Sequence, residues 1–452
     1  MRRDSGDKMK KSNYNKFLNI DNGKRIAFNS MTCALAEVDE NFFAIYENIE
    51  KLEYNSLDEE QRKLVNSMLE GNYIVRDEVD ELKMIQYRHF RSKFAEDTLS
   101  LTIAPTLECN FACPYCYEIP KKGMMSGEIQ DAIIEVIKKR SKKIKKLSIC
   151  WYGGEPLLAQ NSILSLSDKM IRICKDNEIE YSAFMVTNGY LLNDEILNKL
   201  KDCKVTDYQI TVDVPPLIHN QRRKFAGCDC DTYKKIIENI KLLLVKELNP
   251  LIRVNVDSTN AHYVDELLEL LKKEDLLNVK IYFGHVRGEE YYGCSSKSTC
   301  MNCQEYAEFD FKYSKILKEK GFLSASDFYP TLKSNYCGAD NSNAFVIDSE
   351  GNMYKCWNDV GIENLAIANV LNEEKIDDLK YMNNINYLLW TPFDYRECKE
   401  CWLLPVCMGG CPWNGMHKGN KPECEKWKYI IEKSLINKYD IYNNSGETII
   451  GE

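Results

Sequence analysis

Three cysteines stand close together in one short segment of the sequence. Cys109, Cys113 and Cys116 lie in the run E-C-N-F-A-C-P-Y-C-Y-E, with the spacing C-x3-C-x2-C and an aromatic residue, Tyr115, before the last of them. Three thiolates can hold three irons of a [4Fe–4S] cube, which leaves the fourth iron without a protein ligand. Such an iron can bind a small molecule and pass it an electron. A structural zinc site needs four closed ligands, and no fourth cysteine or histidine lies nearby.

This spacing, with its aromatic residue, resembles the signature of the radical S-adenosylmethionine (SAM) enzymes. The resemblance implies that SAM chelates the open iron and that its reductive cleavage yields a 5'-deoxyadenosyl radical. It makes Cys109, Cys113 and Cys116 the catalytic cluster ligands and places Tyr115 in the cofactor site. It also implies an electron donor, such as a flavodoxin or a ferredoxin.

A second motif follows one βα unit later. In W-Y-G-G-E-P, Gly153 and Gly154 allow a ligand to approach the backbone, and Glu155 is an acceptor for a cationic amine. The motif resembles the one that binds the SAM amino group, with an ordinary βα turn as the alternative. The resemblance also implies polar contacts to SAM at the next two strand ends, from Thr187, Asn188, Thr211 and Arg223.

The loop after the fourth predicted strand departs from the family's pattern. Asp213-Val214-Pro215 stands where aspartate-glycine-proline is usual. A β-branched residue does not readily adopt a positive φ. The sequence therefore leaves the role of Asp213 open.

Seven cysteines form another pattern towards the C-terminus. The first two cysteines, Cys337 and Cys356, are separated by thirteen residues, Gly351 and four more residues. A C-x2-C-x5-C-x3-C run follows, and then a last cysteine. The pattern resembles the SPASM domain, which houses two auxiliary iron–sulfur clusters in radical SAM enzymes that modify peptides; a zinc ribbon does not explain the odd number. The family's connectivity implies a distal cluster on Cys398, Cys401, Cys407 and Cys424, and a proximal cluster on Cys337, Cys356 and Cys411.

The proximal ligand set is one short of four. No cysteine lies within thirty residues upstream of Cys337, and the nearest candidates are Cys294, Cys300 and Cys303. Three alternatives follow. One of these cysteines is the fourth ligand of the proximal cluster, or the fourth iron of that cluster stays open for a substrate thiolate, or all three cysteines are free thiols. We expect closure, since three thiols just upstream of a cluster domain favour a ligand among them. The motifs together predict three [4Fe–4S] clusters.

The elements that position these residues alternate along the chain. Strands are predicted at residues 99–105, 147–151, 182–187, 207–212, 252–256 and 280–284. Helices are predicted at residues 127–141, 161–176, 194–201, 232–246 and 263–274. This order is typical of an α/β fold with a parallel sheet, here a partial (β/α)6 barrel. Chemistry in such barrels lies at the C-terminal strand ends, and the first cysteine segment directly follows the first strand.

Residues 13–92 have the pattern of a separate unit. Three strands are predicted at residues 14–20, 25–29 and 34–38. Three helices follow, from about Asn41, from a capping box at Ser56-Leu57-Asp58-Glu59 and from about Asp77. The pattern matches a winged helix and resembles the domain with which peptide maturases hold a leader peptide; a cap without a ligand is the alternative.

These patterns divide the chain into five predicted parts. They are a recognition domain at residues 1–92, the radical SAM barrel at 93–290, a bridging segment at 291–336, the SPASM domain at 337–435 and a frayed tail at 436–452.

Composition narrows the functional classes. The net charge of −9 argues against a nucleic-acid binder, and a mean hydropathy of −0.44 without a long apolar run argues against a membrane protein. The charged N-terminus has no apolar segment behind it, so we expect a cytoplasmic protein. Its 19 cysteines then indicate metal ligands rather than disulfides.

As a whole, the sequence resembles a radical SAM/SPASM maturase of ribosomally made peptides, of the sactipeptide or ranthipeptide kind. We expect hydrogen abstraction from a precursor peptide, followed by a crosslink, above all a cysteine thioether. A carbon–carbon crosslinking or epimerising maturase uses the same parts. An anaerobic sulfatase maturase is disfavoured because Trp357 stands where those enzymes carry a carboxylate. A non-enzymatic electron-transfer protein would not need the G-G-E-P motif.

Overall fold

The computed structural model describes residues 8–287, 299–325, 328–372, 377–417, 419 and 421–445. Contacts divide the chain into two compact units. One consists of Met1–Lys93, Phe328–Tyr336 and Trp390–Glu452, and the other of Phe94–Asp327 and Cys337–Leu389. The predicted C-terminal domain at residues 337–435 is therefore shared between the two units. No helix in the described part of the chain is long and apolar enough to cross a bilayer.

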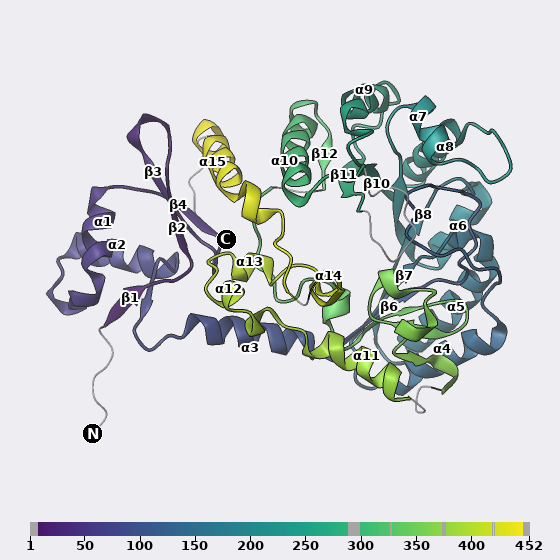
Figure 1. Cartoon of the computed structure of the whole chain (residues 1–452), viewed down its shortest axis with the longest axis horizontal. Helices are drawn as coiled ribbons and strands as arrows, with labels where there is room; N and C mark the ends of the chain where they lie inside the picture. The colour runs from purple at the N-terminus through teal and green to yellow at the C-terminus, as the bar shows by residue number, and fades with distance from the viewer. Residues whose placement is uncertain are drawn as a thin grey trace. The chain divides into compact units, whose positions relative to one another are not determined.

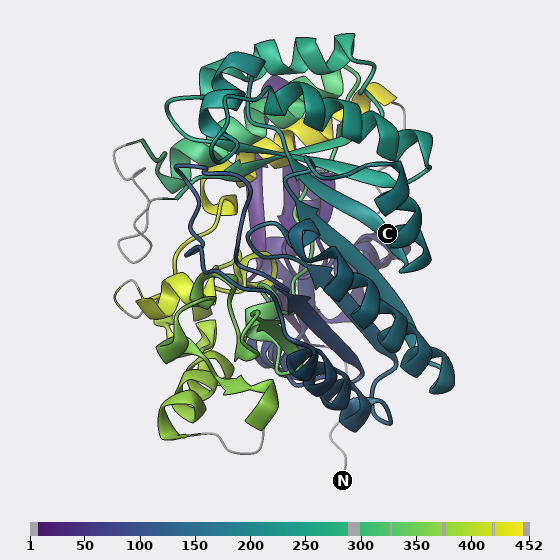
Figure 2. The same cartoon turned by 90° about the vertical axis from the view of Figure 1, so that its right-hand side faces the viewer.

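The second unit is built on a twisted sheet whose six central strands are parallel neighbours in sequence order (Figures 1 and 2). These strands are β6 (Thr98–Ile103), β7 (Lys146–Trp151), β8 (Glu180–Thr187), β9 (Val205–Thr211), β10 (Asn249–Val256) and β11 (Lys280–His285). The crossover helices are α4 (Gly127–Arg140), α5 (Gln160–Asp176), α6 (Asp194–Asp202), α8 (Thr232–Val245) and α9 (Val264–Lys273). The α/β partial barrel is thus confirmed.

Alternation along the strands explains why the helices cover one face of this sheet. In β6, Leu99, Leu101 and Ile103 are at most 1% exposed and belong to a core that includes residues of the crossover helices. Successive side chains of a strand point to opposite faces, so Ser100 and Thr102 lie on the inner face. The inner face is therefore partly polar.

Short strands from later in the chain extend the sheet at both edges. β12 (Leu323–Ser324) pairs with β11, and β13 (Ala344–Ile347) pairs in parallel with β6. β14 (Asn352–Tyr354) and β15 (Ala368–Asn369) continue beyond β13 in antiparallel order. The helices that the sequence did not predict in this unit are α7 (Pro216–Arg222), α10 (Cys303–Glu319) and α11 (Asp378–Leu389).

The first unit contains the predicted three-stranded antiparallel sheet. Its strands are β2 (Asn15–Asn19), β3 (Arg25–Asn29) and β4 (Ala34–Val38), with β2 and β4 as the outer strands. The three predicted helices are α1 (Glu40–Asn48), α2 (Glu59–Glu70) and α3 (Glu81–Lys93). A two-stranded ribbon of β1 (Met9–Lys11) and β5 (Ile74–Arg76) was not predicted.

Two helix starts in this unit differ from the prediction. The N-cap of α2 is Asp58, and its capping box is made with Gln61 rather than by Ser56 and Glu59. Both pairs satisfy the motif, and the chain uses Ser56 to end a 3-10 turn instead. The third helix begins at Glu81 rather than Asp77, because a turn after β5 occupies the residues between, with the Val79 N–H donating to the carbonyl of Arg76.

The C-terminal segment joins the first unit through a shared core. α12 (Arg396–Lys399), α13 (Leu404–Cys407), α14 (Pro412–His417) and α15 (Trp427–Ser445) follow one another. Tyr14 and Ile85 pack with Phe393, Leu404 and Met408. The expected frayed tail from residue 436 is wrong up to the end of α15. Tyr439 is 4% exposed, and its hydroxyl donates to the Glu37 carboxylate.

Candidate functional site

The three thiols of the first motif lie together in the loop that follows β6. The Cys116 thiol interacts electrostatically with both Cys113 and Cys109. The Cys116 N–H donates to the carbonyl of Cys113 at 3.1 Å, and the Phe111 N–H donates to the sulfur of Cys109 at 3.4 Å. The loop thus brings the predicted ligands to one place at the C-terminal end of a barrel strand.

The electrostatics of this loop suit a cationic cluster. Burial raises the pKa of Cys109 and of Cys116 to about 12, and the neighbouring carboxylates and thiols add to the shift. A bound metal stabilises the thiolate form and reverses such a shift. Among the described residues, no three side chains meet as ligands of a single metal ion. In a [4Fe–4S] cube each thiolate binds its own iron, and Cys109, Cys113 and Cys116 fit that donor set.

The two glycines of G-G-E-P allow the cysteine loop itself to approach closely. A Cβ on Gly154 would lie 2.3 Å from the carbonyl oxygen of Glu108, next to Cys109. Gly153 has φ +125°, and a Cβ there would lie 2.3 Å from the carbonyl oxygen of Thr106. The sequence predicted a close approach at these positions, and the structure shows that the approaching group is the backbone before the first cysteine.

Glu155 is fully buried and links the ends of β7 and β8. Its carboxylate accepts hydrogen bonds from the Thr187 hydroxyl at 2.7 Å, the Asn188 N–H at 2.8 Å and the Leu157 N–H at 3.0 Å. The Asn188 side chain in turn donates to that of Asn110 in the cysteine loop at 2.7 Å. The structure therefore brings together Glu155, Thr187 and Asn188, which were predicted to contact SAM, and Asn188 also fixes the cysteine loop.

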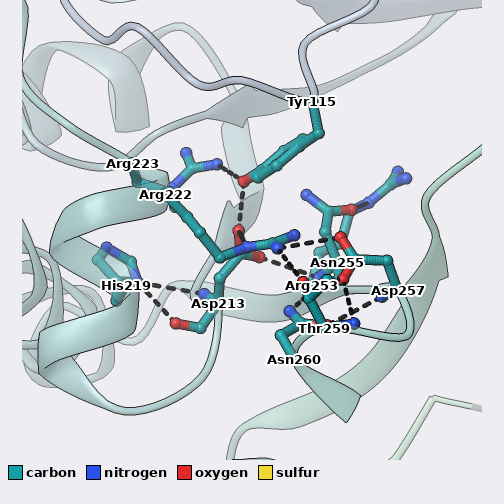
Figure 3. A network of polar contacts seen from close by, with 10 residues as sticks. All are labelled: Tyr115, Asp213, His219, Arg222, Arg223, Arg253, Asn255, Asp257, Thr259 and Asn260. Atoms are coloured by element: carbon teal, nitrogen blue, oxygen red, sulfur yellow. Dashed lines mark hydrogen bonds and ion pairs between the residues drawn. The ribbon is translucent and has the colours of Figure 1, made fainter. Parts of the chain in front are cut away.

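Asp213, whose role the sequence left open, is the centre of a buried polar network (Figure 3). It accepts hydrogen bonds from the Tyr115 hydroxyl and, at 3.0 Å, from the Asn255 N–H. Arg223 donates to the Tyr115 hydroxyl at 2.8 Å. Arg222 lies 3.6 Å from the Asp213 carboxylate. The network ties the aromatic residue of the cysteine motif to the fourth and fifth barrel strands.

Sequence reasoning identified only part of this network. Arg222 and its partner Asp257, 3.0 Å apart, were missed, although the adjacent arginines in H-N-Q-R-R-K were a usable signal.

Val214 adopts φ +37° and is fully buried, so the backbone keeps the positive φ despite the β-branched side chain. Thr211 ends β9 beside Arg253 of β10, and its predicted contact with SAM stays a prediction.

A neighbouring loop pairs with the cysteine loop. The Ala112 N–H donates to the carbonyl of Lys224 at 2.9 Å, and the Ala226 N–H to that of Asn110 at 2.8 Å.

Shortly after this loop in the sequence, Cys228 and Cys230 are joined by a disulfide, whereas composition predicted no disulfides. Two cysteines separated by one residue can pair locally wherever their backbone turns, a constraint that composition does not contain.

Four C-terminal cysteines lie together within the first unit. Burial raises the pKa of Cys398 to about 12, and three neighbouring thiols add to the shift, those of Cys407, Cys401 and Cys424. Burial raises the pKa of Cys401 and Cys407 as well, and nearby backbone N–H groups counter the rise, those of Leu403 and Leu404 at Cys401 and those of Glu425 and Gly409 at Cys407. Hydrogen bonds to sulfur are a general feature of iron–sulfur sites, so this set fits the predicted distal cluster.

The proximal ligand set stays a prediction. Cys337 and Cys356 belong to the second unit and Cys411 to the first. Of the three candidates for a fourth ligand, Cys303 begins α10 and Cys300 lies just before it. Cys294 lies outside the described residues.

Comparisons with known proteins agree with this site. The model of the Radical SAM superfamily matches residues 103–271. The cysteine-type anaerobic sulfatase-maturating enzyme of Clostridium perfringens is 23% identical over 76% of this chain and 99% of its own length. The radical SAM cyclopropyl synthase TigE of Paramaledivibacter caminithermalis is 25% identical over 52% of this chain and 54% of its own length.

Two solved structures share the fold. The C. perfringens enzyme with bound AdoMet and a peptide has a TM-score of 0.57 at 21% identity, over 76% of this chain and 99% of that one. Streptococcus suis SuiB bound to its precursor peptide SuiA has a TM-score of 0.51 at 14% identity, over 92% and 98%.

The fold and the cysteine loop agree with the match of residues 103–271 to the Radical SAM superfamily. The chain is thus similar in sequence to a sulfatase-maturating enzyme and in fold to SuiB.

Proposed function

We propose that this protein matures a ribosomally made precursor peptide by installing an intramolecular crosslink, a cysteine thioether. The observation that carries the proposal is the pairing of two cysteine sites in one chain. One is the three-thiol loop of the barrel, and the other is the four-thiol group beside the antiparallel sheet of the first unit. The structural likeness to SuiB, which was solved with its precursor peptide, extends over both units and supports a peptide substrate.

The residues of the barrel have distinct tasks in this proposal. Cys109, Cys113 and Cys116 would hold a [4Fe–4S] cluster, which together with SAM supplies a 5'-deoxyadenosyl radical. Glu155 and Asn188 fix the cysteine loop against the next strands. Asp213 and Arg223 hold the Tyr115 hydroxyl between them. These ties keep the site rigid, which limits the reaction of a radical to the bond held beside it.

The first unit supplies the proposed leader site. An extended leader peptide would add a strand to β4 or β2, the outer strands of the antiparallel sheet, through backbone hydrogen bonds. The SuiB likeness covers this part of the chain as well. Side-chain pockets along the strand would then select the leader.

The triple substitution Cys109→Ala, Cys113→Ala, Cys116→Ala tests the proposal. We expect the variant to lose about a third of its iron, since one of three clusters is removed, and all reductive cleavage of SAM. Cys174→Ala, a buried cysteine outside both motifs, is the matched control and should keep both. Retained SAM cleavage in the triple variant would refute the proposal, and product mass with the precursor would identify the linkage.

Sulfatase maturation is the second candidate, because the sulfatase-maturating relative matches 76% of this chain. Trp357 argues against it. The resemblance discussed above implies a carboxylate at this position in those enzymes, whereas here the indole ring packs on the ring of Tyr152 with centroids 4.2 Å apart. Incubation with a cysteine-containing sulfatase peptide should therefore give no formylglycine, and its formation would favour this candidate instead.

A further inference from the structure

A positively charged side chain, that of Arg253 in β10, lies on the inner wall of the barrel. In β10, Ile252 and Val254 are fully buried and belong to the core that the crossover helices share. The alternation of the strand puts Arg253 and Asn255 on the opposite, inner face. Figure 3 shows the Arg253 side chain beside Asn255, on the far side of the Asp213 network from His219.

The hydrogen-bond partners of Arg253 are neutral. Its Nε donates to the Asn255 side-chain oxygen at 2.7 Å. One terminal nitrogen lies 3.4 Å from the hydroxyl of Tyr282, which itself donates to Gln209 at 2.7 Å. Among the described residues, no carboxylate forms an ion pair with Arg253, whereas Arg222 close by pairs with Asp257 at 3.0 Å. A partly buried guanidinium without a counter-charge is costly, and an arriving anion would offset that cost.

The neighbouring strand leaves room for this guanidinium. Gly284 of β11 pairs with Asn255. A Cβ on Gly284 would lie 2.6 Å from the Arg253 Nε and 2.7 Å from the Asn255 side-chain oxygen. The position therefore accepts no side chain unless the guanidinium moves.

Arg253 is also close to the proposed reaction site. The N–H of Asn255, two residues further along β10, donates to the carboxylate that holds the hydroxyl of Tyr115. The same strand thus carries the guanidinium and a direct tie to the network behind the cysteine loop.

We propose that Arg253 binds a carboxylate of the peptide substrate, from an aspartate or glutamate side chain or from the C-terminus. The inference rests on the proposed function, since it assumes a peptide in the barrel. A guanidinium presents its donors in a fork that matches a carboxylate. Within the described residues, the second terminal nitrogen of Arg253 makes no hydrogen bond and remains available. The carboxylate of SAM offers the same chemistry, and the test separates the two sources.

The test compares two blocked tripeptides on the reconstituted protein with SAM bound. N-acetyl-Ala-Asp-Ala-amide and its asparagine counterpart differ only in charge, and equilibrium dialysis measures the affinity of each. We expect the wild type to prefer the aspartate peptide by about tenfold, the scale of one hydrogen bond to a charged group. Arg253→Gln should abolish the preference, and Arg253→Lys should keep part of it.

Two further variants keep the result interpretable. Gly284→Ala leaves the charge in place but displaces the guanidinium, so it should also reduce the preference. Arg172→Gln removes an arginine that is ion-paired on the surface of α5, and it should change nothing. Circular dichroism melting checks that each variant is folded.

The outcomes divide clearly. An unchanged aspartate preference in Arg253→Gln overturns the inference while leaving the proposed function intact. A loss of SAM affinity with the preference retained assigns Arg253 to the SAM carboxylate instead and also overturns it. A wild type that binds neither tripeptide overturns it as well. The proposed function fails separately, if the wild type does not modify any precursor.

Discussion

Replacing Glu155 by alanine separates a structural role of this residue from a role in binding SAM. The sequence suggests an acceptor for the SAM amine, but the buried carboxylate already accepts hydrogen bonds from Thr187, Asn188 and Leu157. If these bonds hold the ends of β7 and β8 together, the variant should be less stable even without SAM.

The size of the effect follows from the contacts. Hydrogen bonds to a charged group contribute about 1.5–3 kcal/mol each. Burial raises the pKa of Glu155, which means that its charge is costly to bury, and removing the carboxylate recovers part of this cost. We therefore expect a net loss of about 3–5 kcal/mol, large for a single substitution. At about 2–4 °C per kcal/mol for a unit of this size, the melting temperature should fall by roughly 6–20 °C.

Calorimetry of the reconstituted protein, with and without SAM, is the assay. Glu155→Gln keeps the oxygen that accepts from Thr187 and Leu157 but turns an amide towards the Asn188 N–H, so it should fall between wild type and alanine. Glu195→Gln, which removes an exposed ion-pair partner of Lys199, should shift the transition far less than Glu155→Ala, because solvent screens such a surface pair. A variant Glu155→Ala that melts like the wild type without SAM, but is no longer stabilised by SAM, would refute the structural role.

Three other substitutions or measurements follow from the structure. Gly154→Ala puts a Cβ 2.3 Å from the Glu108 carbonyl and should displace the cysteine loop, so that the iron content falls by about a third; full iron with normal SAM cleavage would contradict this. Val214→Gly loses a buried side chain, but glycine accepts the positive φ without strain, which stabilises the folded state by about 1–2 kcal/mol. Denaturant unfolding should therefore find it no less stable than Val214→Ala, and a clearly more stable alanine variant would show that the positive φ is not strained. Hydrogen–deuterium exchange with added leader peptide should protect amides in β4 (Ala34–Val38) or β2 (Asn15–Asn19), and no protection in either strand would rule out strand addition.

Much of the barrel could be predicted because its signals are local. The β6 run T-L-S-L-T-I alternates between the core and the inner face, and each predicted crossover helix begins and ends within two residues of its observed bounds. The cap of α2 shows the limit of such signals. Ser56 and Asp58 both fit the motif, and the folded chain uses Asp58.

The candidate site likewise contains residues that local motifs identify and residues whose partners are distant in the sequence. The C-x3-C-x2-C and G-G-E-P motifs name their residues from spacing, since each motif lies within one loop. Asp213 depends on Tyr115 and Asn255, which are 98 and 42 residues away in the sequence. No local pattern contains such partners.

By itself, then, the sequence determined the order of strands and helices in the barrel and identified the three-thiol loop, because periodicity and spacing are properties of neighbouring residues. The tertiary structure alone decided that Gly154 makes room for the cysteine loop, that the Glu155 carboxylate accepts three hydrogen bonds and that residues 337–389 and 390–452 belong to different units. It also decided that Arg253 faces the barrel interior without an acidic partner among the described residues. These features depend on which distant segments meet, and burial and charge pairing are fixed only when the chain has folded.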